Sequence, residues 1–378
     1  MTDLLLQNAR VVLPDREVAA DLLVVDGKIA AIGDRLDGGE RIDLAGTSLL
    51  PGFIDVHIHG AIGVDVMDAT AADLRKVSEY LASQGVTSWV PTFVPASDEN
   101  YASAIAAISE AMDVPGVLGV HYEGPFVNTL QCGALHTEYF KTYSSAEDLN
   151  SLPLPPTGVR MITFAPEVSG GIELVRELKR RGWVISIGHT RADPGVLDAA
   201  CDAGARHMTH FMNAMSPLHH RNPGPIAWGL SRDDVTFDCI ADGVHLDPFM
   251  LRLLLKVKGA GSISLISDAI AAAGKGDGDY QIWGETISVK NGRTANASGS
   301  IAGSVISMLD AVRLLHSLGV PYVDLARMAS LNPARLLGVD NFCGSIAVGK
   351  RADLVALDDD NNPVLTLIDG KVSRKGAR

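Results

Sequence analysis

The sequence has few cysteines, few aromatic residues and no long apolar run. Only four cysteines occur in 378 residues, at positions 132, 201, 239 and 343, and no two of them form a Cys-x-x-Cys pair. This spacing argues against both a disulfide framework and a zinc ribbon. No apolar run approaches the length of a membrane span, and the first residues lack the basic segment of a signal peptide. We therefore expect a cytoplasmic protein with no membrane contact.

Positive charge is also scarce. The chain carries 32 Lys and Arg against 45 Asp and Glu, a formal net charge of −13. Such a balance argues against a broad surface for nucleic acid or anionic lipid. An anionic substrate would need a local cationic pocket that offsets the global field. Apolar residues make up 47% of the chain, enough to build a sizeable core.

The two ends of the chain resemble each other in pattern. Both read as short strands separated by turn residues, such as the pair Asp26-Gly27. Neither end has enough strands to form a stable sheet alone. We expect residues 1–49 and residues 344–378 to join into one small β-sandwich domain, with residues 50–343 inserted between them.

The middle of the chain alternates strand-like and helical segments. Eight apolar, β-rich segments are predicted as strands: 49–59, 86–94, 117–123, 160–166, 183–189, 207–212, 236–241 and 262–267. Helices are predicted between most of them, at 70–83, 98–112, 171–181, 194–203 and 248–258. This order favours an α/β fold, a (β/α)8 TIM-like barrel, which typically takes ~250 residues. A doubly wound sheet is the alternative, but it would more often show a glycine-rich nucleotide turn after its first strand. The glycine-rich segment 274–303 is interpreted as an inserted hairpin or lid.

Histidines and carboxylates follow the predicted strands. His57 and His59 are two residues apart on the first strand, so both side chains point to one face, as two ligands of a metal ion must. Further members of the set end the later strands: Glu123, His189, His210, His245 and Asp268. In a barrel all these ends converge on one face, where active sites lie. The pattern predicts a metal-dependent active site.

These motifs resemble the amidohydrolase superfamily and, within it, the family of N-acetylglucosamine-6-phosphate deacetylases. The superfamily features are segments 51–60 and 344–354. The features closer to the deacetylases are six segments in the expected order: 121–126, 133–136, 188–190, 210–215, 241–245 and 266–269. The resemblance runs nearly from end to end of the chain.

The resemblance implies roles for the strand-end residues. Three of them would be the ligands of a tightly held divalent metal: Glu123, His189 and His210. Asp268 would act as the general base and then as the general acid. His57 and His59 would hold a second ion bridged by Glu123, or else would be hydrogen-bonded and without metal. Imidazole and carboxylate ligands suit Zn²⁺, the expected metal, as well as Fe²⁺, Mn²⁺ and Co²⁺.

The same resemblance implies a set of substrate contacts. They are His136, Asn213, Ala214 (through its backbone N–H), Arg221 and His245. His136 would donate to the acetyl carbonyl, and Arg221 would meet the phosphate, since its planar fork binds phosphate oxygens in pairs. Part of this pocket would come from the neighbouring subunit of a homodimer.

The expected activity is deacetylation of N-acetyl-D-glucosamine 6-phosphate to D-glucosamine 6-phosphate and acetate. One alternative is an amidohydrolase for another amide, such as a cyclic imide, which would usually carry a carboxylated lysine near the fourth strand. Residues 160–167 offer no lysine, and Glu123 can replace it. A catalytically dead barrel with a binding role is another alternative, but such relatives typically lose metal ligands, and this chain lacks none.

Overall fold

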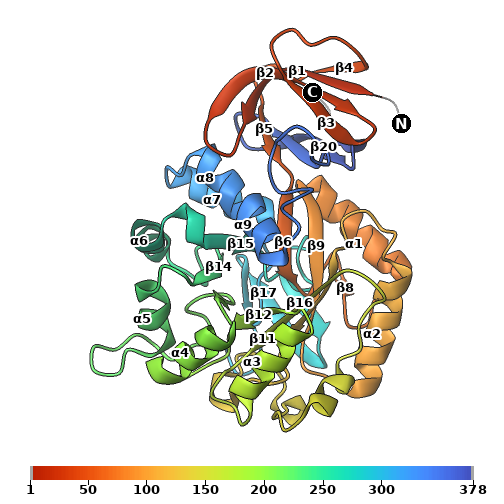
Figure 1. Ribbon diagram of the computed structural model, residues 1–378. Coiled ribbons are helices and arrows are strands. Elements are labelled where there is room, and N and C mark those ends of the chain that lie inside the picture. The colour runs from red at the N-terminus through yellow and green to blue at the C-terminus, as the bar shows by residue number, and fades with distance from the viewer. Residues whose placement is uncertain (1–2, 376–378) are drawn as a thin grey trace.

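The computed structural model describes residues 3–375 and shows a parallel β-barrel beneath a smaller β-sheet (Figure 1). All eight predicted barrel strands are present. They are β6 (Phe53–Ile58), β9 (Val86–Phe93), β10 (Gly119–Glu123), β11 (Val159–Phe164), β12 (Val184–Ile187), β13 (His207–Met208), β14 (Thr236–Ile240) and β15 (Ile263–Ile266). Each strand pairs in parallel with its neighbour in this order, from β6 round to β15. The predicted (β/α)8 fold is confirmed.

The barrel closes between its first and last strands through side-chain and backbone hydrogen bonds. The Asp55 carboxylate of β6 accepts hydrogen bonds from the backbone N–H and the hydroxyl of Ser267, just after β15. The backbone N–H of Asp268 also donates to the His57 carbonyl at 2.9 Å. This seam therefore brings the first histidine of the site beside Asp268.

Helices surround the barrel (Figure 1). The five predicted ones are α1 (Ala71–Ser83), α2 (Asp98–Glu110), α3 (Gly171–Arg180), α4 (Pro194–Ala203) and α6 (Pro248–Lys258). Four further helices and one π-helical segment were not predicted: α5 (Gly224–Ser231), α7 (Met308–Ser317), α8 (Tyr322–Ala326), η5 (Arg327–Leu331) and α9 (Asn332–Leu337). Within residues 3–375, no helix combines the length and the apolar character that crossing a bilayer requires.

Both ends of the chain build the smaller sheet. Its strands are β1 (Leu4–Val12), β2 (Glu17–Val25), β3 (Lys28–Gly33), β4 (Glu40–Asp43), β5 (Ser48–Pro51), β19 (Leu354–Leu357), β20 (Pro363–Ile368) and β21 (Lys371–Lys375). β5 lies between β1 and β19 and so joins the two ends of the chain. The sheet folds over a separate apolar core, which includes Leu22 and Leu354. β5 reaches two residues beyond the expected boundary at residue 49, and the domain boundaries stay predictions.

The glycine-rich segment forms the predicted inserted hairpin. β16 (Gly278–Ile282), β17 (Glu285–Lys290) and β18 (Arg293–Ala295) make a three-stranded antiparallel sheet. Shorter elements complete the loops: the β7 (Gly60–Ala61) and β8 (Val64–Asp65) pair and the 3-10 turns η1 (Thr129–Gln131), η2 (Thr137–Tyr139), η3 (Ala146–Ser151) and η4 (Ala260–Ser262). The hairpin has its own apolar core, which includes Ile270 and Ile287, and this core holds the hairpin against the segment that follows β15.

Candidate active site

The candidate metal ligands and the candidate acid/base lie at the carboxyl ends of five barrel strands. Glu123 is the last residue of β10, and His57 lies near the end of β6. His189, His210 and Asp268 each follow a strand by two residues. All three have a positive φ, of 48°, 32° and 49° respectively. A left-handed backbone costs a residue other than glycine roughly 1–3 kcal/mol, and such strain is typical of functional sites.

One cluster joins Glu123, His189 and His210. The Oε1 atom of Glu123 lies 3.0 Å from Nε2 of His189 and 2.9 Å from Nε2 of His210. The two Nε2 atoms are 3.1 Å apart. All three side chains are buried, with their ligand atoms close enough to share one ion.

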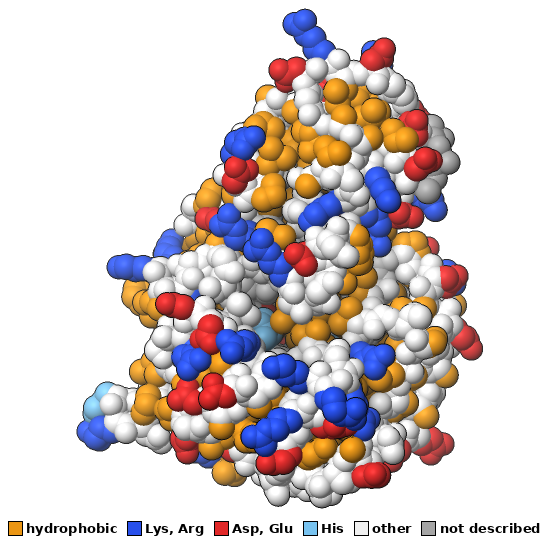
Figure 2. Space-filling view, viewed as in Figure 1, with side chains coloured by type: hydrophobic (Ala, Val, Ile, Leu, Met, Phe, Trp, Pro, Cys, Tyr) orange, Lys and Arg blue, Asp and Glu red, His pale blue; other side chains and the backbone are white. Residues whose placement is uncertain are grey.

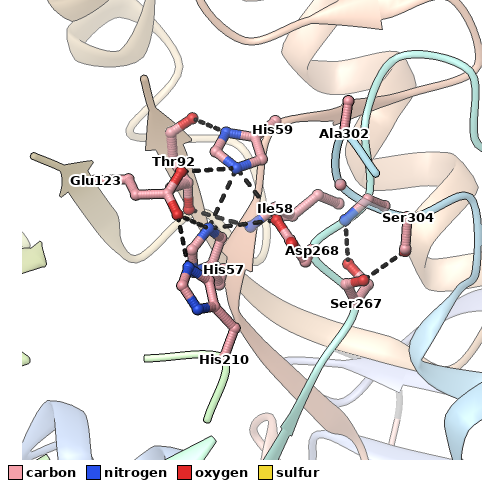
Figure 3. Close-up of polar contacts among 12 residues, drawn as sticks. His57, Ile58, His59, Thr92, Glu123, His210, Ser267, Asp268, Ala302 and Ser304 are labelled. Carbon is pink, nitrogen blue, oxygen red and sulfur yellow. Dashed lines mark hydrogen bonds and ion pairs between the residues drawn. The ribbon is translucent and has the colours of Figure 1, made fainter. Parts of the chain in front are cut away.

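A second cluster shares Glu123 with the first. The Nε2 atoms of His57 and His59 lie 3.1 Å apart, and Nε2 of His59 is 3.3 Å from Oε2 of Glu123. Asp268 stands on the other side of the pair, its Oδ1 at 3.4 Å from Nε2 of His57 and 3.2 Å from Nε2 of His59. Figure 3 shows His59, Glu123 and Asp268 pointing toward this shared centre. Glu123 is therefore placed to bridge two ions.

The hydrogen-bonding pattern of the histidines fits a bound cation. Nδ1 of His59 faces the Thr92 carbonyl at 3.0 Å, and Nδ1 of His189 faces the Gln131 carbonyl at 2.7 Å. A carbonyl only accepts, so each Nδ1 carries a proton, and Nε2 is the nitrogen left to offer its lone pair to a cation. These lone pairs point at the carboxylate of Glu123. Such acceptors repel one another unless a cation lies between them, so the donor set fits a divalent metal.

The carboxylates give the centre a strongly negative potential. Burial disfavours the charged form of the His59 ring, but Asp268 and Glu123 outweigh it and raise the pKa of His59 to about 10. In the same way Glu123 overcomes burial and raises the pKa of His210 to about 9. Burial acts against the charged carboxylate of Asp268, but His57 and His59 lower its pKa below the usual range. The carboxylates therefore favour a positive charge beside these rings, either a proton on Nε2 or a metal ion in its place, and Asp268 stays ionised.

Two carboxylates behind the ligands, the buried Asp238 and the half-buried Glu167, hold the ligand loops in place. Asp238 on β14 accepts a hydrogen bond from the backbone N–H of His210 and lies 3.1 Å from Nε2 of His207. Glu167, after β11, accepts from the Thr190 hydroxyl at 2.6 Å, next to His189. Neither residue is among the predicted site residues, because the strand-end pattern does not distinguish a carboxylate that faces the ions from one that supports the loops.

The cavity in front of the two clusters has a volume of about 330 Å³. That is the size range of small-molecule sites. Three predicted substrate residues line it, namely Asn213, Ala214 and His245. His245 donates from Nδ1 to Asp242 at 2.6 Å, which orients the ring. Apolar residues, among them Leu135, Trp283 and Ile301, line another part of the wall.

The other two predicted substrate residues are not among the residues that line this cavity. Nδ1 of His136 lies 3.2 Å from Oε1 of Glu138, and its Nε2 lies 3.5 Å from Oε1 of Glu285 in the hairpin. The neighbouring residues 133–135 do line the cavity. Arg221 is exposed, and its hydrogen bonds within residues 3–375 are local: Nη1 lies 2.8 Å from Nε2 of His220, and its backbone N–H donates to Nδ1 of His219 at 3.3 Å. Its loop, just before α5, extends away from the body (Figure 1), and histidine and basic side chains gather at the tip of that projection (Figure 2). The assignment of Arg221 as a phosphate contact therefore stays a prediction.

Comparison with known proteins agrees with this geometry. Residues 48–373 match the amidohydrolase family. This chain belongs to that family. It is 38% identical over 339 residues to N-acetylglucosamine-6-phosphate deacetylase of Bacillus subtilis (strain 168), a match that covers 87% of this chain and 85% of the relative. It is also 38% identical over 347 residues to N-acetylgalactosamine-6-phosphate deacetylase of Escherichia coli O157:H7, with 89% and 90% covered.

The chain is also similar to a solved structure over nearly its whole length. A mutant N-acetyl-D-glucosamine-6-phosphate deacetylase from Mycobacterium smegmatis, in complex with N-acetyl-D-glucosamine-6-phosphate, superposes with a TM-score of 0.91 at 32% identity. The match covers 99% of this chain and all of that chain (100%). The family resemblance predicted from the motifs is thus confirmed.

Proposed function

We propose that this amidohydrolase removes the acetyl group from N-acetyl-D-glucosamine 6-phosphate and releases D-glucosamine 6-phosphate and acetate, a step of amino-sugar metabolism. The observation that carries the proposal is the convergence of Glu123, four histidines and Asp268 on a cavity that Asn213, Ala214 and His245 also line. Relatives named as deacetylases of acetylated amino-sugar phosphates support it. The four unpaired cysteines suit a reducing compartment, and location in the cytoplasm stays a prediction.

In this mechanism Asp268 moves the proton. A divalent ion held by Glu123, His189 and His210 would lower the pKa of a water molecule toward about 7 and polarise the acetyl carbonyl. Asp268 accepts the proton that the attacking water loses as the new C–O bond forms. Asp268 then returns that proton to the amide nitrogen as the C–N bond breaks. The amine therefore leaves neutral, and the carboxylate of Asp268 is regenerated. We propose Zn²⁺ as the metal, although Fe²⁺, Mn²⁺ or Co²⁺ would suit the same ligands.

The C4 epimer is a second candidate substrate. The relative named for N-acetylgalactosamine 6-phosphate is as similar in sequence, at 38% identity, as the one named for N-acetylglucosamine 6-phosphate. Measurement of kcat/KM for both phosphorylated sugars and for unphosphorylated N-acetylglucosamine tests the assignment. We expect the phosphorylated gluco sugar to give the highest value. Preference for the galacto epimer would reassign the substrate, and preference for the unphosphorylated sugar would contradict the proposal.

We further propose that a homodimer completes the phosphate site. The net charge of −13 repels a dianionic ester, so the pocket needs a local cation. Arg221 is exposed on a projecting loop, beside the exposed apolar side chain of Leu218. Helix α6, which contacts α5, adds exposed Phe249 and Val257. Exposed apolar side chains on this loop and on α6 suit contact with a second copy of the chain, which would receive Arg221 in its pocket.

Replacing Arg221 with alanine should lower kcat/KM for the phosphorylated sugar by about one to two decades, because a charge-assisted contact contributes about 1.5–3 kcal/mol. The unphosphorylated sugar should be much less affected. Mixing Arg221→Ala chains with Asp268→Asn chains supplies a sharper test, since a mixed dimer would contain one intact site. Activity above that of either parent is expected. Equal losses on both sugars, without recovery in the mixture, would contradict a role in phosphate binding across the dimer.

A further inference from the structure

Trp283 occupies the turn between β16 and β17, in a backbone conformation that bulky residues rarely adopt. Ile282 pairs with Glu285 across the two strands, so Trp283 and Gly284 form a two-residue turn. Their φ values are +54° and +77°. A turn with positive φ at both positions favours asparagine, aspartate and glycine, and tryptophan fits it poorly.

The other turn of the same sheet follows the usual preference. Asn291 and Gly292 join β17 to β18 with φ values of +50° and +73°, and both residues are exposed. The chain thus places asparagine in the turn that faces solvent and tryptophan in the turn that faces the cavity. The demands of the turn do not explain this choice, so an explanation must come from what the indole ring contacts.

The indole of Trp283 lies against the metal centre. Its ring packs edge to face with His59, with the ring centroids 5.2 Å apart and the planes at 84°. It lines the cavity together with Leu135 and Ile301, and it packs against both the barrel core and the hairpin core. The half-buried ring therefore forms an apolar part of the cavity wall, packed on two sides.

The order of the strands indicates which part of the substrate meets this wall. Asn213 and Ala214 follow β13 and His245 follows β14, so the sugar phosphate would lie on that side. Trp283 stands over His59 after β6, and Asp268, after β15, lies between the two sides because β15 comes between β14 and β6 around the barrel. In a trans amide the acyl carbon chain and the nitrogen substituent point away from each other. With the carbonyl carbon at Asp268 and the sugar toward β14, the acyl methyl points toward Trp283.

We propose that Trp283 forms the end wall of the acyl pocket and restricts this enzyme to short N-acyl groups, acetyl above all. The proposal rests on the deacetylase function proposed above and adds the residue that sets the length of the acyl chain. A longer chain would have to displace an indole that two apolar cores and His59 hold in place. One methylene in an apolar pocket typically changes kcat/KM by about 10- to 200-fold, so the selection should be easy to measure.

The test compares N-acetyl-, N-propionyl- and N-butyrylglucosamine 6-phosphate on the wild type, Trp283→Asn and Trp283→Phe. Asparagine suits the turn and removes the ring, so the fold of the hairpin should be retained. In Trp283→Asn the ratio of kcat/KM for propionyl to that for acetyl should rise by about tenfold or more, with phenylalanine between the two. Tyr280→Ala is the matched control, since Tyr280 packs in the hairpin core but does not line the cavity. It should leave the ratio unchanged.

Two results would overturn the inference, and a third would contradict the proposed function. An unchanged ratio in both Trp283 variants, with kcat/KM lowered equally for all three sugars, would mean that the ring stacks on the sugar or supports the loop, and the inference would be overturned. A ratio that rises as much in Tyr280→Ala would assign the selection to the whole hairpin and also overturn it. A wild type that hydrolyses none of the three sugars would instead contradict the proposed function itself.

Discussion

Replacing Asp268 with asparagine should lower kcat by about two to four orders of magnitude, the usual contribution of general acid–base catalysis. Asparagine has the same shape but cannot accept a proton. Asp268 is the one carboxylate that contacts His57 and His59 without belonging to either ligand cluster of the described chain. Its carboxylate also lines the cavity, within reach of a bound amide.

The measurement is kcat together with metal content on the same preparation. The variant should keep its metal, because Glu123, His189 and His210 are unchanged, and it should keep its affinity for the sugar. Asp202→Asn, an exposed change on α4, is the matched control and should behave as the wild type. A fall of less than tenfold with metal retained would show that another group carries the proton.

Replacing Glu123 with glutamine should abolish turnover by removing the metal. Glu123 is the only residue common to the two clusters in the part of the chain that the structure describes, and its carboxylate supplies negative charge to both. Glutamine keeps the volume but loses the charge, which leaves neutral imidazoles as the remaining ligands of a divalent ion. Metal analysis should show that content falls together with activity.

Two further variants test whether the loss of metal is specific to Glu123. Glu173→Gln on the exposed face of α3 should leave both metal and activity unchanged. The double variant His57→Ala/His59→Ala should retain the ion of the first cluster and lose the second, so metal content should fall from near two to near one per chain. Full metal content in Glu123→Gln would contradict the role of this carboxylate, and an unchanged content of one in the double variant would show that the histidine pair holds no ion.

The barrel and the metal centre could be predicted from the sequence because both follow local rules. Apolar segments of strand length define β6 to β15, and parallel strands bring their carboxyl ends to one edge, so the histidines and carboxylates there must meet. Thr70 and Asp73 form a capping box at the start of α1, a signal that can be read from the sequence. Ser307 and Asp310 give the same signal for α7, which could have been predicted in the same way.

Other features depend on contacts between distant segments. Asp55 looks like any buried acid on a strand, and only the closed barrel brings Ser267 to it, 212 residues away in sequence. Trp283 lies in a turn whose usual residues are small and polar, so no local pattern predicts that its ring would reach His59. The family resemblance implies a phosphate contact for Arg221, but no local pattern predicts that its side chain would be exposed and absent from the residues that line the cavity.

Hydrolysis of the amide of N-acetylglucosamine 6-phosphate should require the metal ion. The most direct test follows acetate and free amine released from this sugar by the purified protein, then by the same protein after chelation, and again after one divalent ion has been restored. We predict equal amounts of acetate and amine from the purified protein, no release after chelation, and recovery when the ion is returned. Full-rate release by the chelated protein, shown to be free of metal, would contradict the account.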